Sequence, residues 1–342
     1  MALIKTNARG QSSNLGRRNL IINGAMQVAQ RGTSSTVNGY GSVDRFQILA
    51  GGADEAPTHA QVDVASGTTP YTLGFRKALK ITNGNQTSGA GAADYMGIWQ
   101  HIEGQNISSS GWNTTDPNSK LTFSYWVKSS VAQTFYGRFR AFASSQYEYT
   151  YSFALSANTW TKVTTTVPGN SNFSSLVNTN AVGFYHVWQC FWGTDYTNNK
   201  TLDAWAVKDN ANKSPDMTST WYTTNDATLE ITGVQLETGS TATDFEHRSH
   251  GEDLALCQRY CYARFRTPSY YEGKPKCYYN KLYNLGFCSK LHSYCYNYNW
   301  WALSWQSTTP NYNFWYDNLQ ALFNSIKCSW SYNNTKLGVI KK

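Results

Sequence analysis

Alternation of apolar and polar residues with a period of two runs through the middle of the sequence and most constrains its fold. Residues 121–127 place Leu, Phe, Tyr and Val at every second position, and residues 147–155 continue the pattern over five such positions. The run 160–167 is rich in β-branched residues, and residues 181–190 are apolar nearly throughout. Period-two alternation indicates half-buried β-strands, and a continuous apolar run is typical of a strand buried on both faces.

Clusters of turn-forming residues separate these runs, at residues 83–92, 104–119, 168–180 and 208–220. Many short strands with such punctuation are typical of an antiparallel β-sandwich. Before residue 250 no helical periodicity extends beyond about two turns, and there is no internal repeat of roughly 20–50 residues of the kind that builds propellers. We therefore predict an all-β protein with an antiparallel sandwich.

The composition separates the chain into two parts. Charged residues make up 15% of the chain, whereas about 25% is ordinary for globular proteins. The net charge of +8 comes almost wholly from residues 259–342, which hold 11 basic and 2 acidic side chains. Because this basic part lies outside the predicted sandwich, we do not expect nucleic-acid binding. No segment approaches the roughly 20 apolar residues of a membrane span, so we expect no membrane insertion.

Two segments far apart in the chain carry the most distinctive motifs. One is NLIINGAMQVAQRGTS at 19–34, which we predict to open with a strand, and the other is LEITGVQLETGSTATDFEHR at 229–248. In the second motif the alternation slips by one residue at Gly233, which predicts a β-bulge. Three further motifs follow in order between them: DRF at 44–46, WQHIEG at 99–104 and LTFSYWVKSS at 121–130.

Taken in this order, the motifs resemble the tail-fibre and virion-adhesin proteins of tailed bacteriophages, over roughly residues 19–260. The resemblance implies a jelly-roll β-sandwich similar to a carbohydrate-binding module, and attachment to a host cell-surface polysaccharide. It also implies a homotrimer that is assembled in the host cytoplasm and located on the virion. Two alternatives stay open: a capsid-surface fibre or decoration protein, and a polysaccharide depolymerase.

The resemblance and the composition together predict three parts. Residues 1–18 form an extended arm, either a disordered tail or, as the resemblance implies, a peptide that attaches to other virion proteins, and residues 19–247 form the sandwich. Residues 248–342 hold a short helix, at 251–264, followed by an aromatic-rich tip. For 265–342 two interpretations are open: a divergent tip that binds glycans, or a frame-shifted translation.

A sugar-binding site needs aromatic rings that stack on the flat faces of sugars, with polar groups that bond their hydroxyls. The aromatic candidates in the predicted sandwich are Trp192, Trp112, Trp99, Tyr196 and Trp221. Trp112 and Trp192 stand beside glycines in loop-like sequence, so we expect them to be the most exposed. The alternative for each ring is packing in the core. His186, inside an apolar strand, is expected to be a hydrogen-bonded core residue.

The sequence predicts no enzyme. It contains no GxSxG, HExxH or P-loop motif, and its paired acids, such as Asp54-Glu55, are adjacent residues in turn-like sequence rather than partners across a cleft. The sequence contains no motif that identifies a cofactor. The resemblance implies that a structural calcium ion could lie near the terminal strands, with Asp44, Glu230 and Glu237 as oxygen donors. Their spacing forms no recognised calcium loop.

Overall fold

The computed structural model describes residues 18–261, and this part of the chain consists almost entirely of β-strands. The strands are β1 (Ser34–Ser35), β2 (Phe46–Gly51), β3 (Thr58–Asp63), β4 (Lys77–Thr82), β5 (Tyr95–Glu103), β6 (Lys120–Ser129), β7 (Gln133–Phe142), β8 (Gln146–Leu155), β9 (Thr161–Pro168), β10 (Val182–Trp192), β11 (Trp205–Val207) and β12 (Thr228–Thr238). The helices are α1 (Thr69–Thr72), α2 (Gly104–Ser108), α3 (Thr220–Thr223) and α4 (His250–Gln258), with a 3-10 turn at Ser171–Ser175.

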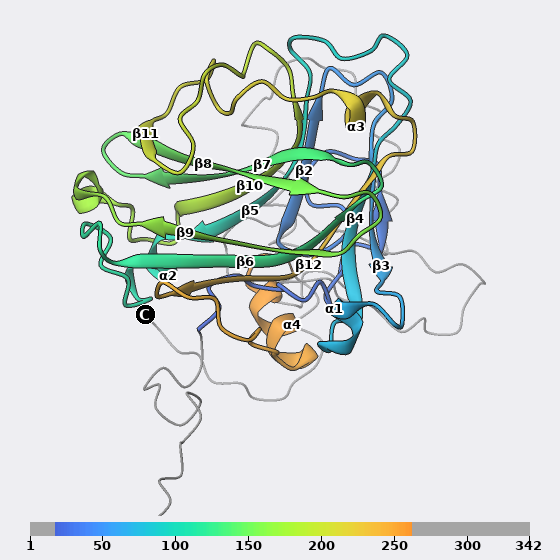
Figure 1. The fold of residues 1–342 in the computed structure, drawn as a ribbon. Helices are drawn as coiled ribbons and strands as arrows, with labels where there is room; N and C mark the ends of the chain where they lie inside the picture. Colours follow the sequence, from blue (N-terminus) through green and yellow to red (C-terminus); the bar gives the residue numbers. More distant parts are fainter. Residues whose placement is uncertain (1–17, 262–342) are drawn as a thin grey trace, which may run out of the picture. The chain divides into compact units, whose positions relative to one another are not determined.

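The strands form two six-stranded antiparallel sheets that lie one over the other (Figure 1). Sheet A has the order β1-β3-β4-β12-β6-β9, and sheet B has the order β11-β8-β7-β10-β5-β2. The central strands β12 and β10 each lie between strands from distant parts of the sequence, as a jelly roll requires. The predicted antiparallel jelly-roll β-sandwich is confirmed. The predicted domain boundaries stay predictions, and most of the arm and the whole aromatic-rich tip lie outside the described residues.

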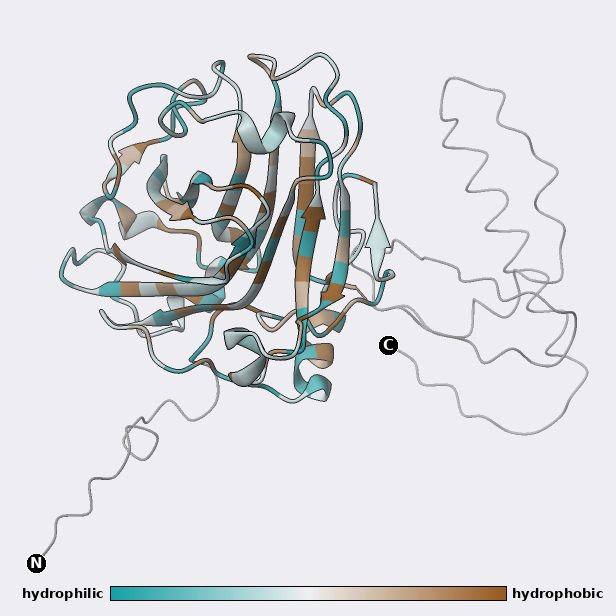
Figure 2. Cartoon of the chain, turned by 45° about the vertical axis from the view of Figure 1, so that its right-hand side comes forward, coloured by the Kyte–Doolittle hydropathy of each residue, from teal (hydrophilic) through white to brown (hydrophobic). Residues whose placement is uncertain are grey.

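Aromatic side chains fill the space between the sheets. The ring of His186 lies 4.2 Å from that of Trp188 and 4.5 Å from that of Phe123, and all three side chains are fully buried. The Nε2 atom of His186 is 2.9 Å from the hydroxyl of Tyr151, so the predicted role of His186 as a hydrogen-bonded core residue is confirmed. Figure 2 shows the alternation that produces this core, with hydrophobic and hydrophilic residues following one another along the strands.

The predicted bulge in β12 is present. The pairing of β12 with β6 skips between Thr232 and Gln235, and Gly233 has a φ of 62°. A positive φ is costly for residues with a Cβ atom, which explains a glycine at this point. The bulge lets both halves of β12 turn their apolar side chains toward the core.

The segment that precedes β1 is not the predicted strand. Asn23 and Met26 have positive φ angles of 60° and 58°, which break an extended conformation. The segment nevertheless lies along β12: the Leu20 N–H donates to the Leu236 carbonyl at 2.9 Å, and the Val234 N–H donates to the Gly24 carbonyl at 2.9 Å. The two distinctive motifs of the sequence are therefore neighbours in the fold.

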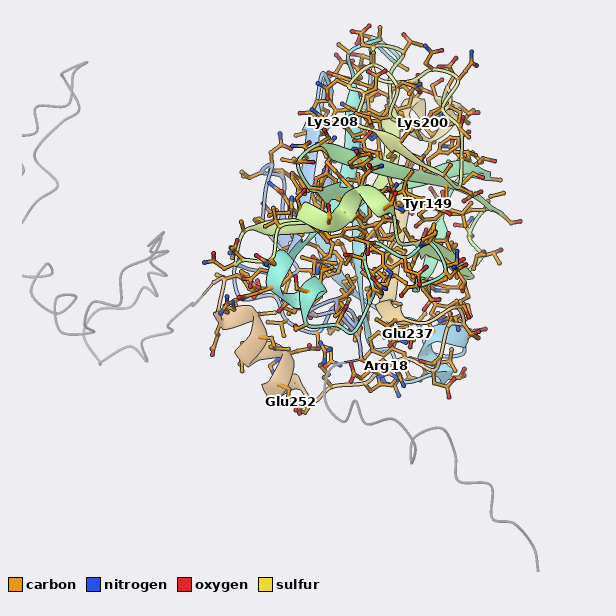
Figure 3. The ribbon with its side chains drawn as sticks, turned by 90° about the vertical axis from the view of Figure 1, so that its left-hand side faces the viewer. Arg18, Tyr149, Lys200, Lys208, Glu237 and Glu252 are labelled. Carbon is orange, nitrogen blue, oxygen red and sulfur yellow. The ribbon has the colours of Figure 1, made fainter. Side chains whose placement is uncertain are left out.

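The chain after β12 returns to the same end of the sandwich. Arg18 and Glu237 form an ion pair at 3.2 Å, and Figure 3 shows them together near the end that carries α4. Helix α4 begins with a capping box between Ser249 and Glu252 and ends at Gln258, so it is shorter than the predicted helix. In the described part of the chain, no helix has the length and apolar character that crossing a membrane requires.

Asn19 joins the two motifs through its side chain, which is almost fully buried. Its Nδ2 donates to the Val234 carbonyl at 3.0 Å, and its Oδ1 accepts from the N–H groups of Ile21 and Leu236 at 2.9 and 3.1 Å. Three backbone groups thus depend on one amide side chain. Leaving them buried without partners is costly because they cannot bond to water instead.

We predict that Asn19→Ala lowers the free energy of unfolding by about 2–4 kcal/mol, because it orphans these backbone groups. Urea unfolding of the full chain measures the change. Asn225→Ala, at an exposed position, is the matched control and is expected to stay within about 0.5 kcal/mol of the parent. Equal stabilities for the two variants would contradict the bridging role of Asn19.

Candidate functional site

Trp112 and Trp221 are core residues and not the sugar-stacking residues expected. The Trp112 indole N–H donates to the Ser119 carbonyl at 3.2 Å, and its ring packs on that of Phe184 at 6.0 Å. Trp221 is completely buried and donates to the Thr228 carbonyl at 3.0 Å. A sugar cannot reach either ring. The expected exposure of Trp112 is therefore wrong, because its indole turns inward and finds its hydrogen-bond partner there.

The other three aromatic candidates come together on the outer face of sheet B. We call them, with two neighbouring tyrosines, the aromatic cluster: Tyr95, Trp99, Tyr185, Trp192 and Tyr196. Trp192 is its centre, stacked on Tyr95 at 5.3 Å, edge-on to Tyr196 at 5.3 Å and tilted toward Trp99 at 6.1 Å. This cluster is separate from the main core, because its strand residues point to the opposite face of the sheet.

Trp192 is nevertheless only 5% exposed, so the expectation that it is an open platform is wrong. The chain between β10 and α3, residues 193–219, contains the edge strand β11, and its residues before and after β11 cover part of this face. We call residues 193–219 the covering segment. Its Asp203 N–H donates to the Thr150 carbonyl at 2.8 Å, and the Thr150 hydroxyl donates to the Lys213 carbonyl at 2.9 Å. The Lys213 ammonium lies 4.3 Å from the centre of the Trp192 ring, which it shields from solvent.

A group of charged side chains lies beside the aromatic cluster, where the covering segment meets strands β7 and β8. We call it the cation cluster: Arg138, Arg140, Glu148, Lys200 and Lys213. Arg138 and Arg140 both donate to the Oε1 atom of Glu148, Arg140 through Nε at 2.9 Å and through Nη2 at 2.5 Å. Lys200 Nζ lies 3.9 Å from Glu148 Oε2. The side chains of Arg138 and Glu148 are at most 1% exposed, which is unusual for charged residues.

The sequence analysis did not identify the cation cluster. Arg138 and Arg140 alternate with Phe139 along β7, and this pattern ordinarily places charges in solvent. The strand register brings Glu148 opposite Arg140. An acidic residue directly opposite Arg140 on the next strand would have indicated an ion pair. The sequence alone does not show which residue is opposite, because that depends on the register between β7 and β8.

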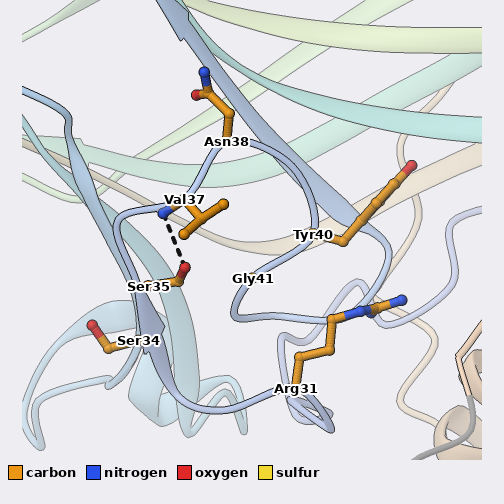
Figure 4. A pocket seen from close by; sticks show the side chains of 7 residues that line it. All are labelled: Arg31, Ser34, Ser35, Val37, Asn38, Tyr40 and Gly41. Atoms are coloured by element: carbon orange, nitrogen blue, oxygen red, sulfur yellow. Dashed lines mark hydrogen bonds between the residues drawn. The ribbon is translucent and has the colours of Figure 1, made fainter. Parts of the chain in front are cut away.

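Near the edge strands of the sandwich the surface contains an open hollow with a volume of about 270 Å³ (Figure 4). It is lined by Arg31, Ser34, Ser35, Val37, Asn38, Tyr40 and Gly41. The lining thus offers hydroxyls, an amide, a guanidinium and a phenol ring around one exposed apolar side chain. A second hollow, of about 200 Å³, shares Asn38 with the first.

A chain of ring contacts connects the hollow with the cation cluster. The Tyr40 hydroxyl is 3.0 Å from His101 Nδ1, the His101 ring is 5.4 Å from that of Tyr185, and the Arg140 guanidinium lies 5.0 Å from the centre of the Tyr185 ring. Burial, and then the nearby Arg45 guanidinium, lower the pKa of His101 to about 4. His101 is therefore neutral near pH 7, and the positive charge of this face comes from Arg140 and its neighbours.

The proposed calcium donors are not brought together. Asp44 bonds to Gln30 and pairs with Arg31 at 3.2 Å. Glu230 pairs with Lys128 at 3.1 Å, and Glu237 pairs with Arg18 at 3.2 Å. Within residues 18–261 no group of three His, Cys, Asp or Glu side chains is arranged to hold a metal ion. These three carboxylates therefore do not fit a shared calcium site, and each one instead bonds to nearby polar groups of the protein.

No protein-family profile and no curated protein matches the sequence. Among solved structures, the enzymatically active domain of bacteriophage CBA120 tailspike protein 4 is 10% identical over 65% of this chain and 22% of that chain, with a TM-score of 0.35. A family 16 carbohydrate-binding module is 12% identical over 64% of this chain and 99% of that chain, with a TM-score of 0.30. The family 11 carbohydrate-binding module of a Clostridium thermocellum cellulosomal cellulase is 12% identical over 61% and 96%, with a TM-score of 0.29. These scores are low, and the fold assignment rests on the strand order and register described above.

We predict that Glu148→Gln lowers the free energy of unfolding by about 3 kcal/mol or more, because it removes the carboxylate that the buried guanidinium of Arg138 and the half-buried one of Arg140 share. Chemical unfolding in sodium chloride, without oxyanions, measures the effect. Glu230→Gln is the matched control: it also removes one carboxylate from an ion pair between strands, but that pair is more exposed, so the loss should stay below about 1 kcal/mol. If Glu148→Gln lowers the free energy of unfolding as little as Glu230→Gln does, water replaces the interactions that Glu148 makes with the basic side chains of the cation cluster.

Proposed function

We propose that this chain is a bacteriophage virion structural protein, a tail fibre or adhesin, whose sandwich binds polysaccharide on the host cell surface. The ordered motifs at 19–34 and 229–248 support the virion assignment. The observation that carries the binding assignment is the open hollow beside Tyr40, which adjoins the aromatic face of sheet B.

The hollow has the chemistry that recognition of a sugar requires. A pyranose ring has apolar C–H faces and a rim of hydroxyls, so it is held by an aromatic ring together with hydroxyl, amide or guanidinium groups. Tyr40 supplies the ring, and Ser34 and Arg31 supply polar groups on the same lining. The volume of about 270 Å³ is slightly below the usual range for drug-sized ligands and suits one or two sugar units of a longer polymer.

The proposal includes the arrangement on the particle. Residues 1–18 attach the chain to other virion proteins, and three copies form a homotrimer. Three identical sites acting on one cell surface raise the effective affinity well above that of a single shallow hollow. This multivalency would offset the limited contact area that each hollow offers.

We further propose that the chain binds polysaccharide without cleaving it. The carboxylates near the candidate surface are engaged in ion pairs, as in Asp44 with Arg31 and Glu148 with Arg140. A glycosidase instead needs two carboxyl groups that flank a sugar linkage, one of them protonated. Measuring the release of reducing sugar from every polysaccharide that the chain binds separates a passive adhesin from a depolymerase.

We predict that Tyr40→Ala weakens polysaccharide binding by about tenfold, because it removes the ring on which a sugar would stack. Binding is measured on an array of bacterial envelope polysaccharides with the full chain. Tyr71→Ala is the matched control. Both tyrosines are half-buried with a guanidinium over the ring, that of Arg31 at 5.6 Å for Tyr40 and that of Arg76 at 4.0 Å for Tyr71, but Tyr71 lies in α1, away from the hollow.

The control variant should retain parental binding, and the melting temperatures of both variants should be compared to exclude unfolding. Two results would count against the proposal. One is the absence of binding to any polysaccharide by a folded, full-length sample. The other is an equal loss of binding in Tyr40→Ala and Tyr71→Ala.

A further inference from the structure

The cation cluster holds more positive charge than its carboxylate can neutralise. Three basic side chains lie around Glu148: Arg138 and Arg140 donate to its Oε1, and Lys200 is 3.9 Å from its Oε2. The fourth, Lys213, lies against the Trp192 and Tyr196 rings at 4.3 and 4.1 Å, and Glu148 acts on its pKa. Cation–π contacts stabilise an ammonium group only in part. Four cations against one carboxylate leave the cluster itself with an excess of three positive charges; the Asp209 carboxylate, which also acts on Lys200, is exposed to solvent.

Several buried donors in and beside the cation cluster have no acceptor within the described residues. They are Arg138 Nε, Gln189 Nε2, Trp192 Nε1 and Ser214 Oγ, and they outnumber the two unpaired acceptors beside them, Glu148 Oε2 and Gln189 Oε1. Gln189 pairs with Tyr136 in the strand register and so lies on the same face as Arg138. Buried polar groups are nearly always hydrogen-bonded in native proteins, and a collection of unpaired donors calls for an acceptor.

The pKa shifts agree with this excess of positive charge. Burial, and then Arg138, lower the pKa of Lys213 to about 8, even though Glu148 acts in the opposite direction; Arg140 and Lys208 also lower it. Burial lowers the pKa of Lys200 as well, while Glu148 and the exposed Asp209 oppose the shift. A further negative charge would stabilise the protonated form of both lysines.

We propose that the cation cluster binds one oxyanion group, a carboxylate, sulfate or phosphate. Guanidinium and ammonium groups are the usual partners of such groups, and the unpaired donors would complete their coordination. Resting on the proposed function, we assign the group to an acidic surface polysaccharide. Arg140 is the entry point: its side chain is 13% exposed, and its contact with Tyr185 leads back to the hollow beside Tyr40.

The first experiment tests the site with a free anion. Thermal unfolding of the full chain is compared in sodium sulfate and in sodium chloride of equal ionic strength at pH 7. Sulfate should raise the melting temperature by about 3 °C or more. Lys200→Met and Lys213→Met should abolish the difference, and Lys208→Met, a half-buried lysine of the same covering segment, should keep it.

The pH dependence gives a second readout. Since Lys213 loses its proton near pH 8, the sulfate effect should shrink between pH 7 and pH 9 in the parent. Both lysine variants should fold, because each loses a cation held among other cations, and their melting temperatures in chloride verify this. Equal melting temperatures of the parent in sulfate and chloride at pH 7 would overturn the proposal, and so would a sulfate effect that survives in both lysine variants.

The second experiment identifies the source of the anion. Binding of polygalacturonate, a carboxylate-bearing polymer, is compared with binding of neutral galactan. At least tenfold tighter binding of polygalacturonate, lost in Lys213→Met and displaced by sulfate, supports an acidic polysaccharide. A sulfate effect on melting without preference for polygalacturonate overturns this assignment and leaves a free-ion site. Binding of neutral polysaccharide that depends on Tyr40, with no sulfate effect, overturns the anion site and leaves the proposed function intact.

Discussion

The burial of aromatic rings between the two sheets is the interaction on which the rest of the structure depends. Trp188, Phe123 and His186 meet at the centre of this layer, and each comes from a strand whose neighbours are distant in sequence. Because successive side chains of a strand point to opposite faces, burying these rings determines which residues face outward. The positions of Arg138 and Trp99 on the outer face of sheet B follow from this packing.

The covering segment then decides what that outer face can do. Without residues 193–219, the strand residues of the aromatic cluster, Tyr95, Trp99, Tyr185 and Trp192, would be an open platform of rings on sheet B. With them, Lys213 lies over Trp192, and Thr150 and Glu148 become buried. The accessible chemistry therefore shifts to the hollow beside Tyr40, and the covered part becomes a positively charged region with unpaired donors. Which groups on this face a ligand can reach therefore depends on the covering segment as well as on the side chains of sheet B.

A considerable part of this protein could be predicted from its sequence, because strand patterns are local. The alternation in 121–127 and 147–155 corresponds to β6 and β8, the slip at Gly233 is a bulge, and His186 is a hydrogen-bonded core residue. The start of the motif at 19–34 is not the expected strand: Asn23 and Met26 have positive φ angles, and the Asn23-Gly24 dipeptide was an available turn signal. The motif at 19–34 nevertheless contains the residues that hydrogen-bond to β12, Leu20 and Gly24.

The sequence by itself determined the class of fold, since a period of two is a property of neighbouring residues and the burial of one face follows from it. Only the tertiary structure decided which rings are accessible and which charges meet. Trp112 and Trp192 have loop-like neighbours yet are buried, because residues distant in the chain pack over them. Arg140 meets Glu148, and Lys128 meets Glu230, through strand register, whereas Asp44 and Glu237 are paired with Arg31 and Arg18 from the segments outside the strands. Exposure and pairing depend on contacts between distant segments, which local patterns do not encode.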